Sequence, residues 1–291
     1  IELDYNAFKN KDWSVSVGAN ATFVKNKIKN LPATMKENGY ISGSKKWLEG
    51  KSIYEFWLRQ WHGVDPQTGD GLYVADVSKY NQGNIGTGDG NITQSQFDEY
   101  KKTVVTIDGK ELTNSYTYAK YDFSGSSIPD VFGGFNVRVS YKNFDLAAVF
   151  SYQLGGQVLD TNYATMMSMT EFGYAQSPDL LKAWKQAGDI TEVPRIDNSA
   201  AHTTNIGQSY STRWLTSSDY LNLRSVTIGY QFPKAWLSKV MLKSARLNLT
   251  AENLFMLKAR QGLNPMANYS GVTYNEYMPS RNITLGLNVS F

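Results

Sequence analysis

The sequence predicts an all-β fold in which antiparallel strands form a transmembrane β-barrel. Three observations support this fold class. The mean hydropathy is −0.41, so the average residue is polar. Aromatic residues nevertheless make up 13% of the chain, and no stretch approaches the roughly 20 apolar residues that a membrane helix needs. A barrel combines these features because only alternate residues face lipid, the lumen is wet, and aromatic girdles lie at both interfaces.

Charge and cysteine content narrow the possible functions. A formal net charge of +3 on 291 residues is too small to indicate a nucleic-acid partner. We find no dense basic patch interleaved with stacking aromatics. Cysteine is absent, which excludes a disulfide scaffold and thiolate metal sites.

Five segments alternate between apolar and polar residues over the roughly 9–11 residues that a tilted strand needs to cross a bilayer. A soluble β-sandwich also alternates, but its strands usually have about 5–6 residues, so the barrel is favoured. The five apolar sets are Trp13, Val15, Val17, Ala19, Ala21 and Phe23; Phe135, Val137, Val139 and Tyr141; Phe144, Leu146, Ala148, Phe150 and Tyr152; Ala245, Leu247, Leu249 and Ala251; and Ile283, Leu285, Leu287, Val289 and Phe291.

The second and third sets test this interpretation. Only Lys142 and Asn143 separate them, which predicts a two-residue hairpin with Asn143 tolerating a positive φ. Tyr141 and Phe144 must then be cross-strand partners on one face. The alternation already puts them on the same face, with no change of register.

Charged residues give a second test, because a Lys or Arg that faces lipid near the midplane costs about 2–4 kcal/mol. The five strands contain Arg138, Asp145, Arg246 and Glu252, and all four fall on the polar face. We therefore predict that they face the lumen.

The segment from Tyr220 to Phe232 breaks the alternation. Leu221 and Leu223 are at odd-numbered positions, whereas the apolar residues from Val226 onward are at even-numbered ones. In a regular strand, Arg224 would then share the lipid-facing side with Val226. A β-bulge near Arg224 would restore a single apolar face, and we predict one there.

The predicted connections differ in length. Two are short (142–143 and 9–12), whereas about 77–130 and 155–218 are long and polar, as in bacterial barrels. With weaker strands at 1–8, about 52–63 and about 71–76, the count is roughly nine. An odd count cannot close the usual even-stranded barrel, and Ile1 starts within an alternating segment. We therefore expect a fragment whose remaining strands lie upstream.

Several motifs resemble those of SusC/RagA-type TonB-dependent transporters. Residues 129–146 (PDVFGGFNVRVSYKNFDL) are similar to the family's "GG…YKGFDL" hairpin, with Asn143 in place of the commoner Gly. Residues 220–233 (YLNLRSVTIGYQFP) resemble its "YLRLKNVTLGYTLP" strand. Shorter similarities are residues 50–53 (GKSI), 63–69 (GVDPQTG), 193–195 (VPR), 251–255 (AENLF) and 279–286 (PSRNITLG).

The resemblance implies an energy-coupled importer of oligosaccharides or oligopeptides in the outer membrane of a Gram-negative bacterium. Residues 1–291 would form the C-terminal portion of a barrel of about 22 strands, whose lumen an N-terminal plug closes. A SusD-like surface lipoprotein would cover it as a lid, and TonB would act through the absent N-terminal region. Two alternatives stay open: a passive porin or structural barrel, and a soluble β-rich carbohydrate-binding module.

No residue is a candidate for catalysis or for binding a metal or cofactor. A Gly-x-Ser-x-Gly motif is absent, and no base lies beside a serine. His62 and His202 lack acidic neighbours at metal-ligand spacing, so we expect surface or lumen histidines. A partial calcium-loop pattern begins at Asp89, but Gln94 replaces the expected Gly, so a polar loop is the better interpretation.

Tryptophans are the candidates for substrate contact, because an indole ring can stack on a sugar or pack on a peptide. The alternative for each is a role in an interfacial girdle or in the core of a loop. The candidates are Trp47, Trp57, Trp61 and Trp184.

Overall fold

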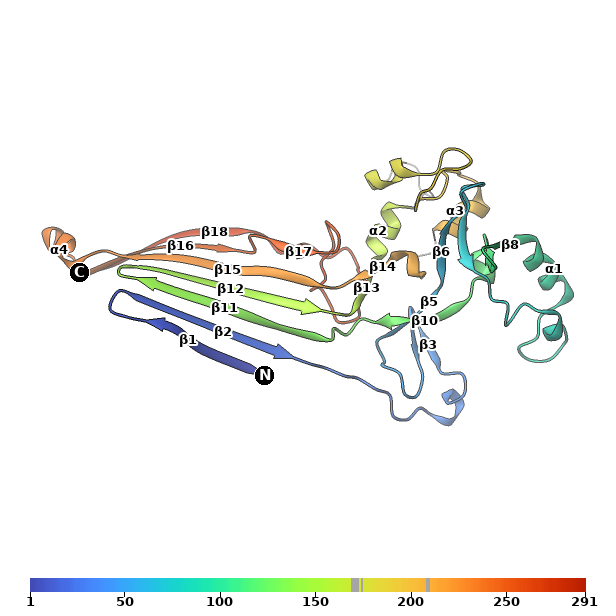
Figure 1. Cartoon of the computed structure of the whole chain (residues 1–291), viewed down its shortest axis with the longest axis horizontal. Coiled ribbons are helices and arrows are strands. Elements are labelled where there is room, and N and C mark those ends of the chain that lie inside the picture. Colours follow the sequence, from blue (N-terminus) through green and yellow to red (C-terminus); the bar gives the residue numbers. More distant parts are fainter. Residues whose placement is uncertain (169–172, 174, 208–209) are drawn as a thin grey trace.

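A computed structural model describes residues 1–168, 173, 175–207 and 210–291; parts of the predicted connection 155–218 therefore lie outside the described residues. The largest element is an antiparallel sheet with the strand order β1-β2-β11-β12-β15-β16-β18, and the short β17 pairs with β15 (Figure 1). Its strands are β1 (Glu2–Lys9), β2 (Trp13–Thr22), β11 (Val131–Tyr141), β12 (Phe144–Leu154), β15 (Tyr220–Gln231), β16 (Ser244–Glu252), β17 (Met256–Lys258) and β18 (Asn282–Ser290). The protein is thus mostly strands, as the sequence predicts.

One face of this sheet is apolar from edge to edge. The register aligns Tyr5 with Val17, and Leu249 with Leu285, so the apolar residues of neighbouring strands share a face. Many of them are exposed to solvent, including Leu285 at 69% and Phe144 at 54%. An exposed apolar face beside a polar one is the pattern of a lipid-facing barrel wall.

Aromatic side chains form a row at one end of the apolar face. Trp13 pairs with Tyr141, which pairs with Phe144, which pairs with Tyr230. The ring centroids of Trp13 and Tyr141 are 4.3 Å apart, and those of Phe144 and Tyr230 are 4.5 Å apart. This row has the composition of an aromatic girdle at a membrane interface.

The predicted hairpin at Lys142 and Asn143 is confirmed, because Tyr141 pairs directly with Phe144. The prediction of a positive φ at Asn143 is wrong: the residue with positive φ is Lys142, at 53°. The first central residue of a type I′ or II′ hairpin needs φ > 0 whatever its side chain, so turn geometry overrides residue preference here.

The predicted bulge in β15 is also confirmed. Val149 pairs with Ser225 and Phe150 with Leu223, so Arg224 is the extra residue on its strand. The bulge brings Leu221 and Leu223 onto the same face as Val226, as the parity argument requires.

The longest connections leave the sheet at one end, and the shorter connections 10–12, 142–143 and 232–243 lie at the other (Figure 1). We call residues 23–130, 155–219 and 253–281 the loop layer. The segments 52–63 and 71–76 form strands here, in small sheets of their own, so the long sheet has seven long strands and β17. The small sheets contain β3 (Tyr40–Ser42), β4 (Lys45–Trp47), β5 (Glu55–Arg59) and β10 (Tyr121–Ser126); β6 (Trp61–Val64), β7 (Gly71–Val74), β8 (Val104–Ile107) and β9 (Lys110–Thr113); and β13 (Gln157–Leu159) and β14 (Leu215–Ser217).

The helices are short, and within the described ranges none is long and apolar enough to cross a membrane. In α1, Thr93 and Gln96 form a capping box. The α-helices are α1 (Gln94–Thr103), α2 (Thr161–Met166), α3 (Ala200–Ile206) and α4 (Lys234–Leu237). The 3₁₀ helices are η1 (Ala33–Met35), η2 (Gln82–Asn84), η3 (Tyr116–Tyr118), η4 (Pro178–Lys182), η5 (Thr212–Trp214) and η6 (Ser238–Val240).

The loop layer has hydrophobic cores of its own. Phe56 and Leu58 of β5 are fully buried and pack with Leu159 and Trp214. A second cluster surrounds Tyr100 of α1. The long connections are therefore folded structures beyond one end of the sheet (Figure 1).

Candidate functional site in the loop layer

A cleft with a volume of about 1280 Å³ opens in the loop layer between η4 and the chain that leads to α3. Its walls include Leu181 and Ile196, which are 80% and 67% exposed. Trp184, Lys185 and Asp197 also line it, so the cleft offers an indole ring, aliphatic side chains and both signs of charge.

Trp184 is fixed at the wall of this cleft. Its indole N–H donates to the carbonyl oxygen of Pro66 at 2.9 Å. The ring lies against Gly69, where a Cβ atom would be 2.5 Å from it and where φ is +74°. Because a side chain at this position would meet both the ring and an unfavourable backbone conformation, glycine is required for this packing.

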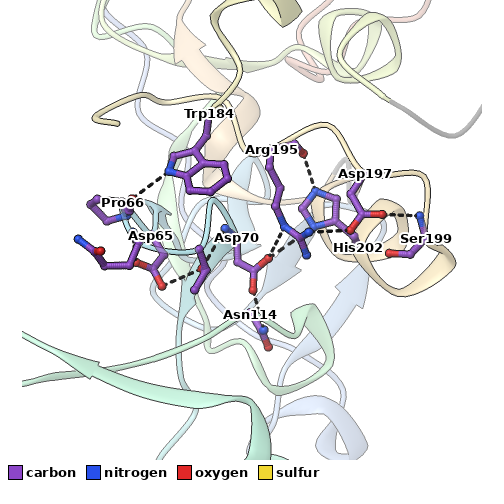
Figure 2. Close-up of polar contacts among 11 residues, drawn as sticks. Asp65, Pro66, Asp70, Asn114, Trp184, Arg195, Asp197, Ser199 and His202 are labelled. Carbon is purple, nitrogen blue, oxygen red and sulfur yellow. Dashed lines mark hydrogen bonds and ion pairs between the residues drawn. The ribbon is translucent and has the colours of Figure 1, made fainter. Parts of the chain in front are cut away.

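Asp70 links three segments of the loop layer beside the cleft (Figure 2). Its Oδ1 accepts a hydrogen bond from Nε of Arg195 at 3.0 Å, and its Oδ2 accepts one from Nδ2 of Asn114 at 3.2 Å. Arg195 also pairs through Nη1 with Oδ2 of Asp197 at 2.9 Å. The guanidinium therefore bridges two carboxylates at the edge of the cleft.

His202 of α3 lies behind Arg195, with a side chain that is only 6% exposed. Its Nε2 donates to the carbonyl oxygen of Arg195 at 2.8 Å, which leaves Nδ1 facing Oδ1 of Asp70 at 3.8 Å. The expectation of a surface or lumen histidine is therefore wrong for His202, because it lies on the buried side of α3 with Thr203 and Ile206; His62 is exposed. Within the described part of the chain, no group of three or more His, Cys, Asp or Glu residues could hold a metal ion.

The surroundings favour the charged form of Asp197 and disfavour that of Arg213. The backbone N–H of Ser199, followed by the Ser199 side chain and the charge of Arg195, lowers the pKa of Asp197. Deeper in the layer, burial lowers the pKa of Arg213 to about 10, so it stays a cation at neutral pH. The Arg213 guanidinium lies 4.3 Å from the ring centroid of Trp214 and 4.7 Å from that of Trp61.

Of the four candidate tryptophans, Trp184 alone lines the cleft. Trp61 packs edge-on against Tyr73 under Arg213. Trp57 is half-buried on β5, beneath the Lys46 ammonium at 4.1 Å. Trp47 is also half-buried and contacts Tyr40. The structure does not bring the four together, and a substrate contact by any of them stays a prediction.

The four charged residues singled out from the sequence lie on the polar face of the long sheet, opposite the apolar one: Arg138, Asp145, Arg246 and Glu252. Nη2 of Arg246 and Oδ2 of Asp145 form an ion pair at 2.7 Å across the strand between them. Gly229 lies under this pair, and a Cβ there would be 2.2 Å from the guanidinium. Arg138 is on the same face as Ser16, and Glu252 accepts a hydrogen bond from Asn282. Their contact with a plug or substrate stays a prediction.

Sequence reasoning missed Asp70, Asn114 and Asp197 as parts of one site. They lie in long polar connections without periodicity, so nothing in the residue pattern pairs them. The only available signals were the short motifs at 63–69 and 193–195. In the structure, Pro66 of the first motif bonds Trp184, and Arg195 of the second donates its backbone N–H to Gly69.

Comparison with known proteins identifies the class of the chain. No protein-family model matches it. TonB-dependent receptor P3 of Formosa agariphila is 26% identical over 300 residues, which cover 97% of this chain and 27% of that receptor. TonB-dependent receptor P39 of the same organism is 24% identical over 341 residues, covering 100% of this chain and 31% of the receptor. The chain thus spans less than a third of the length of these relatives.

Solved structures show the same fold. The RagAB peptide transporter has a TM-score of 0.74 at 22% identity, covering 100% of this chain and 28% of that chain. The RagAB peptide importer in its closed-closed state also has a TM-score of 0.74, at 24% identity, covering 100% and 29%. The chain is therefore homologous to TonB-dependent receptors. More narrowly, it has the fold of the SusC-like RagA barrel, in agreement with the motif resemblance.

Proposed function

We propose that this chain forms the C-terminal wall and part of the outer loop layer of a TonB-dependent importer in the bacterial outer membrane. The observation that carries the proposal is the long sheet. Its apolar face is continuous across seven long strands, its other face is polar, and its longest connections leave from one end. This arrangement suits a barrel with periplasmic turns and extracellular loops, and the receptors to which the chain is similar are proteins of this kind.

The substrate class that we propose is an oligosaccharide or oligopeptide too large for a porin. The cleft beside Trp184 exceeds the 300–1,000 Å³ typical of small-molecule sites. Trp184 would stack on a sugar or pack on a peptide, whereas Leu181 and Ile196 favour apolar peptide side chains. The RagAB neighbours are peptide transporters, which supports the peptide alternative.

The partners follow from the same class. We propose that a SusD-like surface lipoprotein closes over the loop layer and that TonB acts through a plug and N-terminal region upstream of this chain. On the polar face, Arg138, Asp145, Arg246 and Glu252 would contact the plug or passing substrate. An ion pair such as Asp145–Arg246 gives that face a fixed charge pattern.

The test is uptake by cells that produce the full-length protein, its lipoprotein partner and TonB. Labelled oligopeptides and oligosaccharides of matched size are supplied to cells with and without TonB. We expect TonB-dependent uptake of one of the two classes. Uptake that is equal without TonB would indicate a passive barrel, and a full-length protein that is monodisperse without detergent would indicate a soluble module.

Substitution of Trp184 sharpens the test of the site. Trp184→Ala should reduce uptake several-fold, since the ring forms part of the cleft wall. The matched control is Trp236→Ala, at the opposite end of the sheet in α4, where the side chain is 59% exposed. An equal effect of both substitutions would exclude the cleft as the site of substrate contact.

A further inference from the structure

The positive charge of the chain is concentrated in one segment. Residues 23–51 contain seven lysines and two glutamates, a formal charge of +5, whereas the whole chain carries +3. The rest of the chain is therefore slightly acidic, at −2. The segment begins where β2 leaves the long sheet, so the charge lies next to the outer end of the apolar face.

Three of these lysines continue the apolar row of β2. Trp13, Val17 and Ala21 occupy odd-numbered positions on the apolar face, and Phe23 follows at 64% exposure. Lys25, Lys27 and Lys29 then occupy the next odd-numbered positions, and all three are exposed. In an extended chain, alternate side chains point the same way, so the lysines project on the lipid side.

The even-numbered positions hold this segment against the loop layer. Oδ1 of Asn26 accepts hydrogen bonds from the backbone N–H of Ile53 at 2.9 Å and from the hydroxyl of Ser52 at 3.1 Å. The Ile28 N–H donates to the carbonyl oxygen of Lys51 at 2.8 Å, and its own carbonyl accepts from Gly50 N–H at 2.9 Å. The backbone between the lysines is thereby fixed, and the three lysine side chains are exposed.

The height of the lysines matches the lipid headgroups. A strand rises about 3.3 Å per residue, and a tilt of about 40° reduces this to about 2.5 Å along the membrane normal. The row from Trp13 to Phe23 then spans about 25 Å, which is the height of the apolar band of such barrels. Lys25, Lys27 and Lys29 follow at about 5, 10 and 15 Å beyond Phe23, in the headgroup region and just above it. Figure 1 shows the chain continuing in line with β2 before it turns into the loop layer.

These charges are not neutralised by neighbouring acids. Over the described ranges, the salt bridge formed by this segment is that of Lys36 with Glu49, at 3.7 Å. Lys51 is not part of this row of lysines; its ammonium lies 4.5 Å from the ring centroid of Phe123. Lysine binds phosphate as a point charge, and each basic residue near a membrane surface strengthens the attraction of anionic lipid about fivefold.

We propose that Lys25, Lys27 and Lys29 form a binding site for the phosphorylated headgroup of an outer-leaflet glycolipid. The acyl chains of that lipid would lie against the apolar row that ends at Phe23. The proposal rests on the outer-membrane location of the proposed function, but it does not depend on the transported substrate. A negative result in the lipid-binding experiment would therefore leave the proposed uptake standing, and a negative uptake result would leave the lipid site standing.

The experiment measures binding of lipid A to the purified full-length protein in a neutral detergent, by native mass spectrometry at increasing lipid concentration. The variant K25Q/K27Q/K29Q should bind phosphorylated lipid A at least tenfold and up to about 100-fold more weakly than the unchanged protein. The matched control is K101Q/K102Q/K110Q, which removes the same charge from α1 and β9, away from the sheet. This control should bind as the unchanged protein does.

Two further measurements show whether binding depends on the lipid phosphate and on the acyl chains. Dephosphorylated lipid A should bind as weakly to the unchanged protein as phosphorylated lipid A binds to K25Q/K27Q/K29Q. Inorganic phosphate should not displace the lipid, because it lacks the acyl chains. The proposal is overturned if K25Q/K27Q/K29Q binds normally, if the control variant loses as much affinity, if the lipid phosphate makes no difference, or if inorganic phosphate competes. Circular dichroism of each variant confirms that the barrel is folded.

Discussion

The long sheet and the loop layer use large apolar residues in opposite ways. In the sheet, Leu285 and Phe144 are more than half exposed, whereas Phe56 and Leu58 of β5 are completely buried. Both regions consist of antiparallel strands with alternating residues. The difference teaches that the loop layer supplies its own apolar partners, whereas in the proposed barrel lipid would cover the apolar face of the sheet. The two regions should therefore respond differently to mutation.

The largest expected effect is that of a truncation in the loop-layer core. Phe56→Ala in the full-length protein should lower the free energy of unfolding of the loop layer by about 3–5 kcal/mol, because it leaves a cavity in a packed core. Hydrogen exchange should show lost protection in β5 and β10 and unchanged protection in β11 and β12. The matched control, Phe144→Ala on the apolar face, should leave the loop layer protected. Loss of protection across both regions would contradict their independence.

A charge on the apolar face is the next largest effect. Leu285→Arg should cost about 2–4 kcal/mol, since the guanidinium would face lipid near the middle of β18. The adjacent Thr284→Arg places the same side chain on the polar face and should cost much less. Chemical denaturation of the full-length protein in lipid vesicles measures both. Equal costs would show that the apolar face is not against lipid.

A smaller effect should appear in the pH dependence of the loop layer. Burial lowers the pKa of Lys45 from 10.5 to about 7, partly offset by the charge of Glu55. Its ammonium keeps hydrogen bonds to the carbonyl of Tyr54 at 3.0 Å and the hydroxyl of Ser127 at 3.2 Å, which limits the cost of burying it.

The direction of the pH effect follows from proton binding. Between about pH 7 and 10.5 the unfolded state binds more protons at Lys45 than the folded state does, so stability should rise with pH across this window. Below about pH 7, Lys45 is protonated in both states and contributes no further change. Denaturation at pH 6, 8 and 10 should show the rise in the unchanged protein and a flatter profile in Lys45→Met. Identical profiles would exclude Lys45 as the titrating group.

The smallest effect is expected from the ion pair on the polar face. Arg246→Gln should cost about 1 kcal/mol or less, because the side chains of Arg246 and Asp145 are 36% and 31% exposed and water screens the pair. The cost should shrink further in 1 M salt. Glu252→Gln, at a residue that forms no salt bridge with the described part of the chain, serves as the control. A cost of several kcal/mol for Arg246→Gln would show that the polar face is drier than proposed.

Prediction from the sequence succeeded where the information is local. The Tyr141–Phe144 pairing and the bulge at Arg224 both followed from a period of two residues. The second bulge, between Asn6 and Phe8, was missed because β1 alternates weakly there. The strands at 52–63 and 71–76 were found, but their membership of separate sheets was not, because alternation specifies a strand and its faces without specifying its partner.

Among the roughly nine strands that it predicted, the sequence by itself located the seven long ones. It also determined their apolar and polar faces and the class of protein, because strand periodicity and short motifs are properties of neighbouring residues. Only the tertiary structure decided which loop residues meet. Asp70 and Arg195 are 125 residues apart in the chain, and Pro66 and Trp184 are 118 apart. It also decided that the backbone between Lys25 and Lys29 is fixed, since Asn26 and Ile28 find their partners at residues 50–53, and that these lysines are exposed. Contacts of this kind depend on how the loops pack, and no local pattern encodes that packing.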